Sequence, residues 1–274
     1  MTKIEPYWNP SKDMKDFRFS IRKESREGFF DVSEVPEAVL PFFVFTYVLE
    51  GEILVEVEGE PYLCQAGQVL MIPRNLPFRV LHFKGNISYE CGFSLHALKD
   101  VSYECLHDPH PLKQAFWFDD AVFTASLLEL MLNAWKRKDH ILTQTALDLF
   151  LCRLKLQEGH PANSTVSSFL EKVFDRSRKP GKVSDYADEL CITPNYLNRL
   201  VRTQTGHSAM DWIEISRLNL AKSLLKQGSL QISEIAAAVG IDDQSYFTRF
   251  FKKNEGYTPS QYRDMVLAEK NEKS

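Results

Sequence analysis

The last third of this 274-residue chain contains an internal repeat, and no other feature constrains the fold as strongly. Residues 183–192 (VSDYADELCI) match residues 232–241 (ISEIAAAVGI) at an offset of 49. Residues 196–202 (YLNRLVR) then match residues 246–252 (YFTRFFK) at an offset of 50. One residue has therefore been added between the matched blocks, where a turn is expected, and both copies are predicted to share one backbone fold.

Each copy is predicted to be a short helix, a tight turn and a second helix, which together form a helix-turn-helix. In the first copy Thr193 is a natural N-cap, and Pro194 suits the first helical position because its missing N–H costs nothing there. In the second copy Asp242 or Asp243 caps the helix in the same way. The second helix of each copy is expected to end at a glycine, followed by a cap for the next helix: Gly206 and Ser208, then Gly256 and Thr258.

A single helix is predicted to join the two copies, from Ser208 to Gln227 and closed by Gly228. Its apolar residues, among them Trp212, Ile213, Leu220 and Leu224, recur at helical spacing. About 20 residues at 1.5 Å each make a rod of about 30 Å. That length is close to the roughly 34 Å between successive major-groove faces of B-DNA. The joining helix could therefore present both copies to one side of a duplex.

The second helices of the two copies each carry a polar face. The predicted outward residues are Asn195, Asn198, Arg199 and Arg202 in the first copy, and Gln244, Ser245, Thr248, Arg249 and Lys252 in the second. The predicted inward residues are Leu197, Leu200 and Val201, then Tyr246, Phe247, Phe250 and Phe251. One polar face is typical of any surface helix. Two faces of Asn, Gln and Arg, which make bidentate contacts to base edges, favour DNA recognition.

The second copy carries a specific family signature: IAAAVGI at 235–241, SYFTRFFKK at 245–253, GYTP at 256–259 and then Tyr262-Arg263. These residues closely resemble the AraC/XylS family of bacterial transcriptional regulators, over about Val166 to Met265. The resemblance implies a seven-helix DNA-binding domain, often preceded by a cupin-like sensor. It implies base contacts through Asn195, Asn198, Arg199, Gln244, Ser245 and Arg249, and phosphate contacts through Arg202, Thr248, Lys252 and Lys253.

Two positions leave that assignment open. Arg249 could instead form a salt bridge within its own domain. Cys191 stands where glycine is frequent in the family, so the turn of the first copy departs from the family pattern.

The charge of the chain bears on how such a domain would bind DNA. The whole chain has a net charge of −4, but residues 164–274 hold 16 basic and 14 acidic side chains and the first 163 residues hold 17 and 23. The acidity thus belongs to the first half. Because the second half is only weakly basic, non-specific attraction to DNA should be weak and recognition should depend on the two polar faces.

The first half is predicted to form a small antiparallel β-barrel or sandwich. From Phe42 to Leu95 apolar and polar residues alternate in short runs that are separated by glycine and proline turns. A Gly-Glu turn at 51–52, a Gly-Gln turn with an apolar run closed by proline at 67–73, and Pro77 resemble the cupin barrel. We place the barrel at about residues 15–105.

A catalytic metal is not expected in this barrel. Metal-dependent cupins carry a His-x-His pair, and the corresponding residues 46–51 (TYVLEG) contain no histidine. A barrel of this size could still enclose one small ligand. The candidate pocket residues are Tyr47, His82, Tyr89 and Cys91. The same four side chains could equally well be ordinary core.

Two amphipathic helices are predicted after the barrel, at about 120–138 and 140–157, with Asp119-Asp120 as a cap. They could pack on the barrel or pair with a second copy of the chain. The segment 159–164 (GHPANS) breaks the helical pattern and is the predicted domain boundary.

The predicted fold is a two-domain α+β chain. Residues 1–160 form a cupin-like sensor or dimerisation domain, and residues 161–274 form an all-α DNA-binding domain with helix-turn-helix units at 183–206 and 232–256. The expected partners are double-stranded DNA, a small-molecule effector, a second copy and RNA polymerase. No cofactor, metal or enzymatic activity is expected. Five scattered cysteines, without a Cys-x-x-Cys pair, and the lack of a signal or spanning segment favour the cytoplasm.

Two other functions remain as alternatives. A metal-independent cupin enzyme, or a ligand-binding protein with an accessory helical domain, would also fit the barrel. A scaffold that binds protein would fit the helical repeat, although its cationic and amide-rich faces differ from the apolar face that such partners usually offer.

Overall fold

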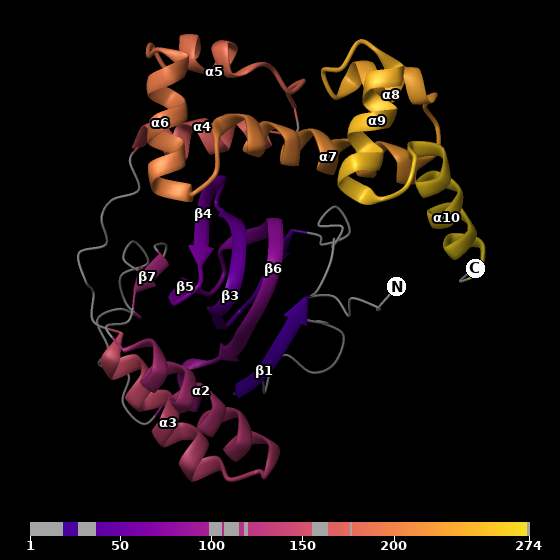
Figure 1. The fold of residues 1–274 in the computed structure, drawn as a ribbon. Helices are drawn as coiled ribbons and strands as arrows, with labels where there is room; N and C mark the ends of the chain where they lie inside the picture. Colours follow the sequence, from indigo (N-terminus) through magenta and orange to yellow (C-terminus); the bar gives the residue numbers. More distant parts are fainter. Residues whose placement is uncertain are drawn as a thin grey trace. The chain divides into compact units, whose positions relative to one another are not determined.

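The computed structural model describes residues 19–26, 37–98, 106, 115–117, 120–154, 164–175 and 177–272. The described chain forms two compact units, one ending at residue 154 and the other beginning at residue 164. The first unit is an antiparallel sheet with two helices, and the second is built of helices (Figure 1). The protein is therefore a two-domain α+β chain. Residues 159–163 of the predicted boundary lie outside the described part, which contains no helix long and apolar enough to cross a membrane.

The sheet runs in the order β1-β6-β3-β5-β7, with β2 paired to β6 and β4 to β3. Its strands are β1 (Phe19–Arg26), β2 (Ala38–Val39), β3 (Phe43–Val57), β4 (Glu60–Gln65), β5 (Gln68–Ile72), β6 (Pro77–Phe93) and β7 (Ala115–Trp117). Among these strands the outermost, β1 and β7, do not pair with each other, so the predicted closed barrel is wrong. The number of strands and turns in the sequence indicated a small antiparallel sheet but did not determine its closure.

Strands β3 and β6 are longer than the sequence pattern predicted. Gly85 has φ +51 and lies within β6, where a strand break was expected, and register shifts occur between Val48 and Glu50 and between Glu50 and Glu52. Such irregularities bend a strand without ending it. The alternating runs are therefore segments of two long, bent strands.

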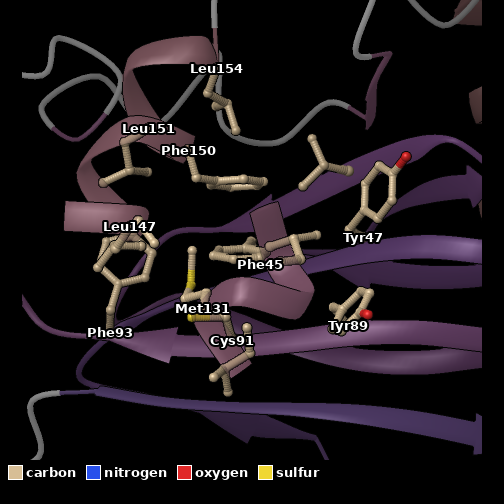
Figure 2. Close-up of a cluster of buried hydrophobic side chains, with 14 of the residues drawn as sticks. Phe45, Tyr47, Tyr89, Cys91, Phe93, Met131, Leu147, Phe150, Leu151 and Leu154 are labelled. Carbon is tan, nitrogen blue, oxygen red and sulfur yellow. The ribbon is translucent and has the colours of Figure 1, made fainter. Parts of the chain in front are cut away.

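Two helices cover one face of the sheet. They are α2 (Ala121–Lys136) and α3 (His140–Arg153), capped by Asp120 and Asp139 as their N-caps. Phe45 of β3 stacks on Phe150 of α3 with ring centroids 4.3 Å apart, and Met131 of α2 belongs to the same buried cluster (Figure 2). The two predicted helices thus pack on the sheet, which was one of the two alternatives left open by the sequence.

The described part of the second domain has seven helices. They are α4 (Ser164–Phe174), α5 (Val183–Glu189), α6 (Pro194–Thr205), α7 (Ala209–Gln227), α8 (Ile232–Ala238), α9 (Gln244–Glu255) and α10 (Pro259–Glu272). Helices α5 and α6 form the first helix-turn-helix, here called unit one, and α8 and α9 form the second, unit two. Helix α7 joins them, and α6 and α9 lie toward its two ends (Figure 1).

The predicted caps of these helices are confirmed. Thr193 Oγ1 accepts a hydrogen bond from the Tyr196 N–H, and Asp243 accepts from two N–H groups of α9. Gly206 and Gly256 end α6 and α9 in the left-handed conformation, at φ 76° and 79°. Helices α6 and α9 therefore begin and end through the same kinds of contact.

Candidate nucleic-acid interface

Helix α6 presents an exposed polar surface near its N-terminal end. Asn195, Arg199 and Arg202 are exposed, as predicted for readout and phosphate contact. The Arg199 guanidinium lies over the Tyr196 ring, 5.2 Å from its centroid. Stacking of this kind orients a guanidinium whose donors stay available to guanine O6 and N7. On the inner side Leu197 and Val201 are fully buried, which fixes the rotation of the helix.

Helix α9 presents an equivalent surface. Gln244, Ser245, Arg249, Lys252 and Lys253 are all exposed, while Phe247, Phe250 and Phe251 are buried against α7 and α10. The pKa of the Asp243 carboxyl is lowered, first by the Tyr246 and Ser245 N–H groups that it accepts from and also by the charge of Arg249. The capping carboxylate therefore stays ionised at the start of this helix, on the same surface as the candidate base readers.

Not every predicted contact residue points to solvent. Thr248 is half-buried, and its hydroxyl donates to the Gln244 carbonyl at 2.9 Å. Asn198 is also half-buried, and its Oδ1 accepts from the Ala209 N–H at 3.0 Å. Both side chains thus have an internal hydrogen bond that the sequence pattern did not indicate.

One residue predicted to be internal is exposed instead. Tyr246 was placed in the apolar seam of α9, but half of its surface is accessible, and Tyr196 at the matching position of α6 is 41% exposed. Both tyrosines lie in the first turn of their helix, beside the seam formed by the residues that follow. The candidate surface of each helix therefore includes one aromatic ring that helical periodicity assigned to the core.

Helix α7 is held by polar contacts inside the domain. In its middle Ser216 Oγ donates to the Val173 carbonyl at 2.6 Å and Arg217 donates to the Gly181 carbonyl at 2.8 Å. Toward its end Lys222 forms a 2.6 Å ion pair with Glu255 at the end of α9. A 19-residue helix rises about 28 Å. Helix α9 is thus tied to this rod by the Lys222–Glu255 pair and α6 by the bond from the Ala209 N–H to Asn198, and the rod has about the length between successive major grooves.

Residues 186–265 match the family model described as a helix-turn-helix domain. The arabinose operon regulatory protein of Salmonella typhimurium is 26% identical over 236 residues, which cover 81% of this chain and 83% of that protein. The corresponding Escherichia coli protein is 40% identical over 81 residues, 30% of this chain and 28% of that protein. The C-terminal domain of AraT, a response regulator from Geobacillus stearothermophilus, is 31% identical, covers 38% of this chain and 88% of that chain, and has a TM-score of 0.36.

Residues 186–265 carry a helix-turn-helix domain of the AraC type. The chain is a transcriptional regulator with this DNA-binding domain, and the two arabinose operon proteins named above are regulators as well. In this regulator the matched residues include α6, α7, α8 and α9, so the candidate readout surfaces described above lie inside the matched domain.

Three of the four candidate pocket residues of the first domain lie in one cluster, and His82 is not part of it. Tyr47, Tyr89 and Cys91 lie in the apolar cluster under α2 and α3 (Figure 2), and Tyr89 donates its hydroxyl proton to Glu129 of α2. Burial raises the pKa of the Cys91 thiol and of the Tyr47 hydroxyl, so both stay neutral. His82 lies near the beginning of β6, opposite Leu54, with its Nε2 3.5 Å from Glu52 Oε1.

A different set of polar side chains is buried in the sheet. Strand β1 pairs Arg22 with Glu90, and Arg22 Nη2 donates to Glu90 Oε2 at 2.8 Å. Asn86 and Ser88 precede Glu90 at alternate positions on the same face of β6, and both are fully buried. Neither the Asn86 amide nor the Ser88 hydroxyl has a hydrogen-bond partner among the described residues. Periodicity missed this set because alternation along β6 does not show that both faces of the strand are buried.

Metal-binding geometry is not present in the described part of the chain. No group of three or more His, Cys, Asp or Glu side chains lies there in an arrangement that could hold a metal ion.

Proposed function

We propose that this regulator binds one side of a DNA duplex by placing α6 and α9 in successive major grooves. Asn195 and Arg199 of α6, and Gln244, Ser245 and Arg249 of α9, would contact base edges. Arg202, Lys252, Lys253 and Thr248 would contact phosphates, and the Thr248 hydroxyl would turn its proton from the Gln244 carbonyl to a phosphate oxygen to do so. The observation that supports this most is the pairing of two exposed Asn/Gln/Arg surfaces on one 19-residue rod.

A gel-shift titration at fixed salt tests these readout surfaces. The double variant Arg199→Ala with Gln244→Ala should bind a wild-type-selected DNA fragment about a hundredfold more weakly, because each bidentate contact contributes about 1–3 kcal/mol. Arg137→Ala, an exposed arginine of the first domain, is the matched control and should bind like the wild type. Unchanged binding by the double variant would show that the base readers lie elsewhere.

We propose that the first domain is a cupin-like sensor for a polar small molecule that contacts Asn86 and Ser88. Buried polar groups in folded proteins are almost always hydrogen-bonded, so two fully buried unpartnered ones call for a ligand or ordered water. Polar metabolites titrated into the protein while tryptophan fluorescence is followed should give a saturable change. Asn86→Leu with Ser88→Ala should abolish that change, and a response that survives both substitutions would exclude this site.

We propose that two copies associate through α2 and α3. Val122 at the start of α2 is 79% exposed and Ile141 at the start of α3 is 75% exposed, with Leu130 and Leu149 more than 40% exposed further along. Exposed apolar side chains gathered on two neighbouring helices are typical of an association surface. Sedimentation should show a dimer that Ile141→Lys dissociates.

The proposed cellular setting is the cytoplasm, where the regulator would meet DNA and RNA polymerase.

A further inference from the structure

The side chain of Asn198 joins the first recognition helix to α7. Asn198 lies in the middle of α6, and its Oδ1 accepts from the N–H of Ala209, the first residue of α7. The first N–H groups of a helix have no partner within the helix. Ser208 already accepts from Asp211, and Asp211 accepts in return from the Ser208 N–H, so Asn198 supplies the acceptor that this capping box leaves out.

Unit two shows what happens where this donor is absent. At the same offset of 50, Asn198 corresponds to Thr248 and Ala209 corresponds to Pro259, the first residue of α10. Proline has no N–H, so α10 needs no acceptor at that point. The Thr248 hydroxyl accordingly bonds to its own helix, at the Gln244 carbonyl. Unit one therefore has both the asparagine acceptor and the backbone N–H donor, and unit two has neither of them.

This contact also limits what Asn198 can do on DNA. Bidentate recognition of adenine uses both the oxygen and the nitrogen of an asparagine amide. Turning Oδ1 toward a base would leave the buried Ala209 N–H without a partner, which costs as much as a lost hydrogen bond or more. Asn195 and Arg199, which are exposed, have no such cost in the contacts described.

We propose that Asn198 is a positioning residue: by binding the Ala209 N–H it sets the angle between α6 and α7, and so the spacing at which the two recognition helices meet DNA. This inference rests on the proposed two-groove function. It assigns Asn198 to the geometry of the protein instead of to base readout.

The test is a double-mutant cycle in the full chain, with DNA duplexes selected from a random pool by the wild type. Asn198→Ala should weaken binding about tenfold with every base preference unchanged, and should reduce the penalty for one base pair inserted between the half-sites. Ala209→Pro removes the donor, and Ser208, at φ −72° and ψ 159°, has the backbone conformation that a following proline requires. In the Ala209→Pro background, Asn198→Ala should change the affinity for DNA by less than about twofold, because residue 209 then has no N–H that the substitution could leave unpaired.

A second variant keeps the test informative if Asn198→Ala does not fold. Asn198→Asp retains the acceptor, so it should keep the wild-type melting temperature and slow exchange of the Ala209 amide proton. Loss of preference at a single base pair in Asn198→Ala, or equal effects of Asn198→Ala with and without Ala209→Pro, would overturn the proposal. If the wild type selected no preferred sequence from the random pool, that result would instead reject the two-groove function itself.

Discussion

The two helix-turn-helix units have the same backbone but reach it through different contacts. The second residue after the first helix of each unit adopts the left-handed conformation, at φ 56° for Cys191 and φ 80° for Gly240. A Cβ at Gly240 would lie 2.3 Å from the Pro180 carbonyl oxygen, whereas Cys191 is exposed. The turn therefore needs a left-handed residue in both units, but packing requires glycine only in unit two.

The ends of the two recognition helices differ more. In unit one Thr205 Oγ1 accepts from the Trp212 indole N–H at 2.9 Å. The matching residue in unit two is Glu255, whose carboxylate is paired with Lys222, and the two side chains are only 6% and 3% exposed. A neutral hydrogen bond can be lost at modest cost, but a buried charge without its partner is strongly unfavourable. Unit two should therefore be the more sensitive unit to substitution.

The largest effect is expected at this ion pair. Lys222→Met leaves the Glu255 carboxylate buried and should lower the free energy of unfolding by about 3–5 kcal/mol, measured by urea denaturation followed by circular dichroism. Thr205→Val, which removes the acceptor at the matching position of unit one, should cost about 1–3 kcal/mol because the Trp212 indole N–H and the His207 N–H that lose it are neutral. Adding Glu255→Leu to Lys222→Met should recover most of the loss, and equal costs in the two units would contradict the comparison.

The next effect is expected at the turn of unit two. Gly240→Ala combines a left-handed alanine with a clash against the Pro180 carbonyl, so it should destabilise the domain by about 2–4 kcal/mol. Cys191→Ala, at the matching turn, should stay within about 0.5 kcal/mol of the wild type because the position is exposed and already carries a Cβ. Thermal unfolding of both variants checks the contrast. Similar losses at both turns would mean that unit one is packed as tightly as unit two.

A smaller gain is expected from repairing the turn of unit one. Cys191→Gly relieves the left-handed strain of a residue with a side chain, while the added freedom of glycine in the unfolded chain offsets part of that gain. The melting temperature should rise by an amount equivalent to at most about 1 kcal/mol. A fall in melting temperature would show that the cysteine side chain makes a contact that outweighs the strain.

The smallest effect is expected at Glu189, whose matching residue in unit two is Ala238. Hydrogen bonds from Arg178 and then Lys172 lower the pKa of the Glu189 carboxyl to about 2. Its contribution is therefore present above pH 4.5, the ordinary value, and is lost as pH falls toward 2. Because the side chain is 35% exposed, the contribution should be below about 1 kcal/mol.

Glu189→Gln should flatten the fall in stability between those pH values. Asp188→Asn serves as the charge control on the same helix, and an unchanged slope in Glu189→Gln would reject the effect.

The helical domain could be predicted closely because its local signals agree with one another. Thr193, Pro194, Asp243 and the two terminal glycines mark the ends of the recognition helices in the sequence, and the structure confirms them. The side-chain bonds of Asn198 and Thr248 were missed because helical periodicity reports which face a residue lies on and not which backbone group it meets. Tyr246 was misassigned because the first turn of a helix lies at the edge of the seam.

The sheet was harder to predict because its decisive contacts are distant in sequence. Alternation within β6 could not distinguish the face that packs under α2 and α3 from the face that carries Glu90, since both faces are buried. It therefore grouped His82 with Tyr89, although the two residues lie seven positions apart on β6. Closure of the sheet depends on whether its outermost strands pair with each other, and the sequence of one strand does not show which strand it pairs with.

The most direct test of the account is the DNA sequence that each recognition helix selects. Wild type, Arg199→Ala and Arg249→Ala would each select duplexes from one random pool at the same salt concentration, followed by sequencing. The wild type should select two blocks whose centres lie about 10–10.5 base pairs apart. Arg199→Ala should lose the preference within one block and Arg249→Ala within the other. A single selected block, or loss of the same block in both variants, would contradict the account.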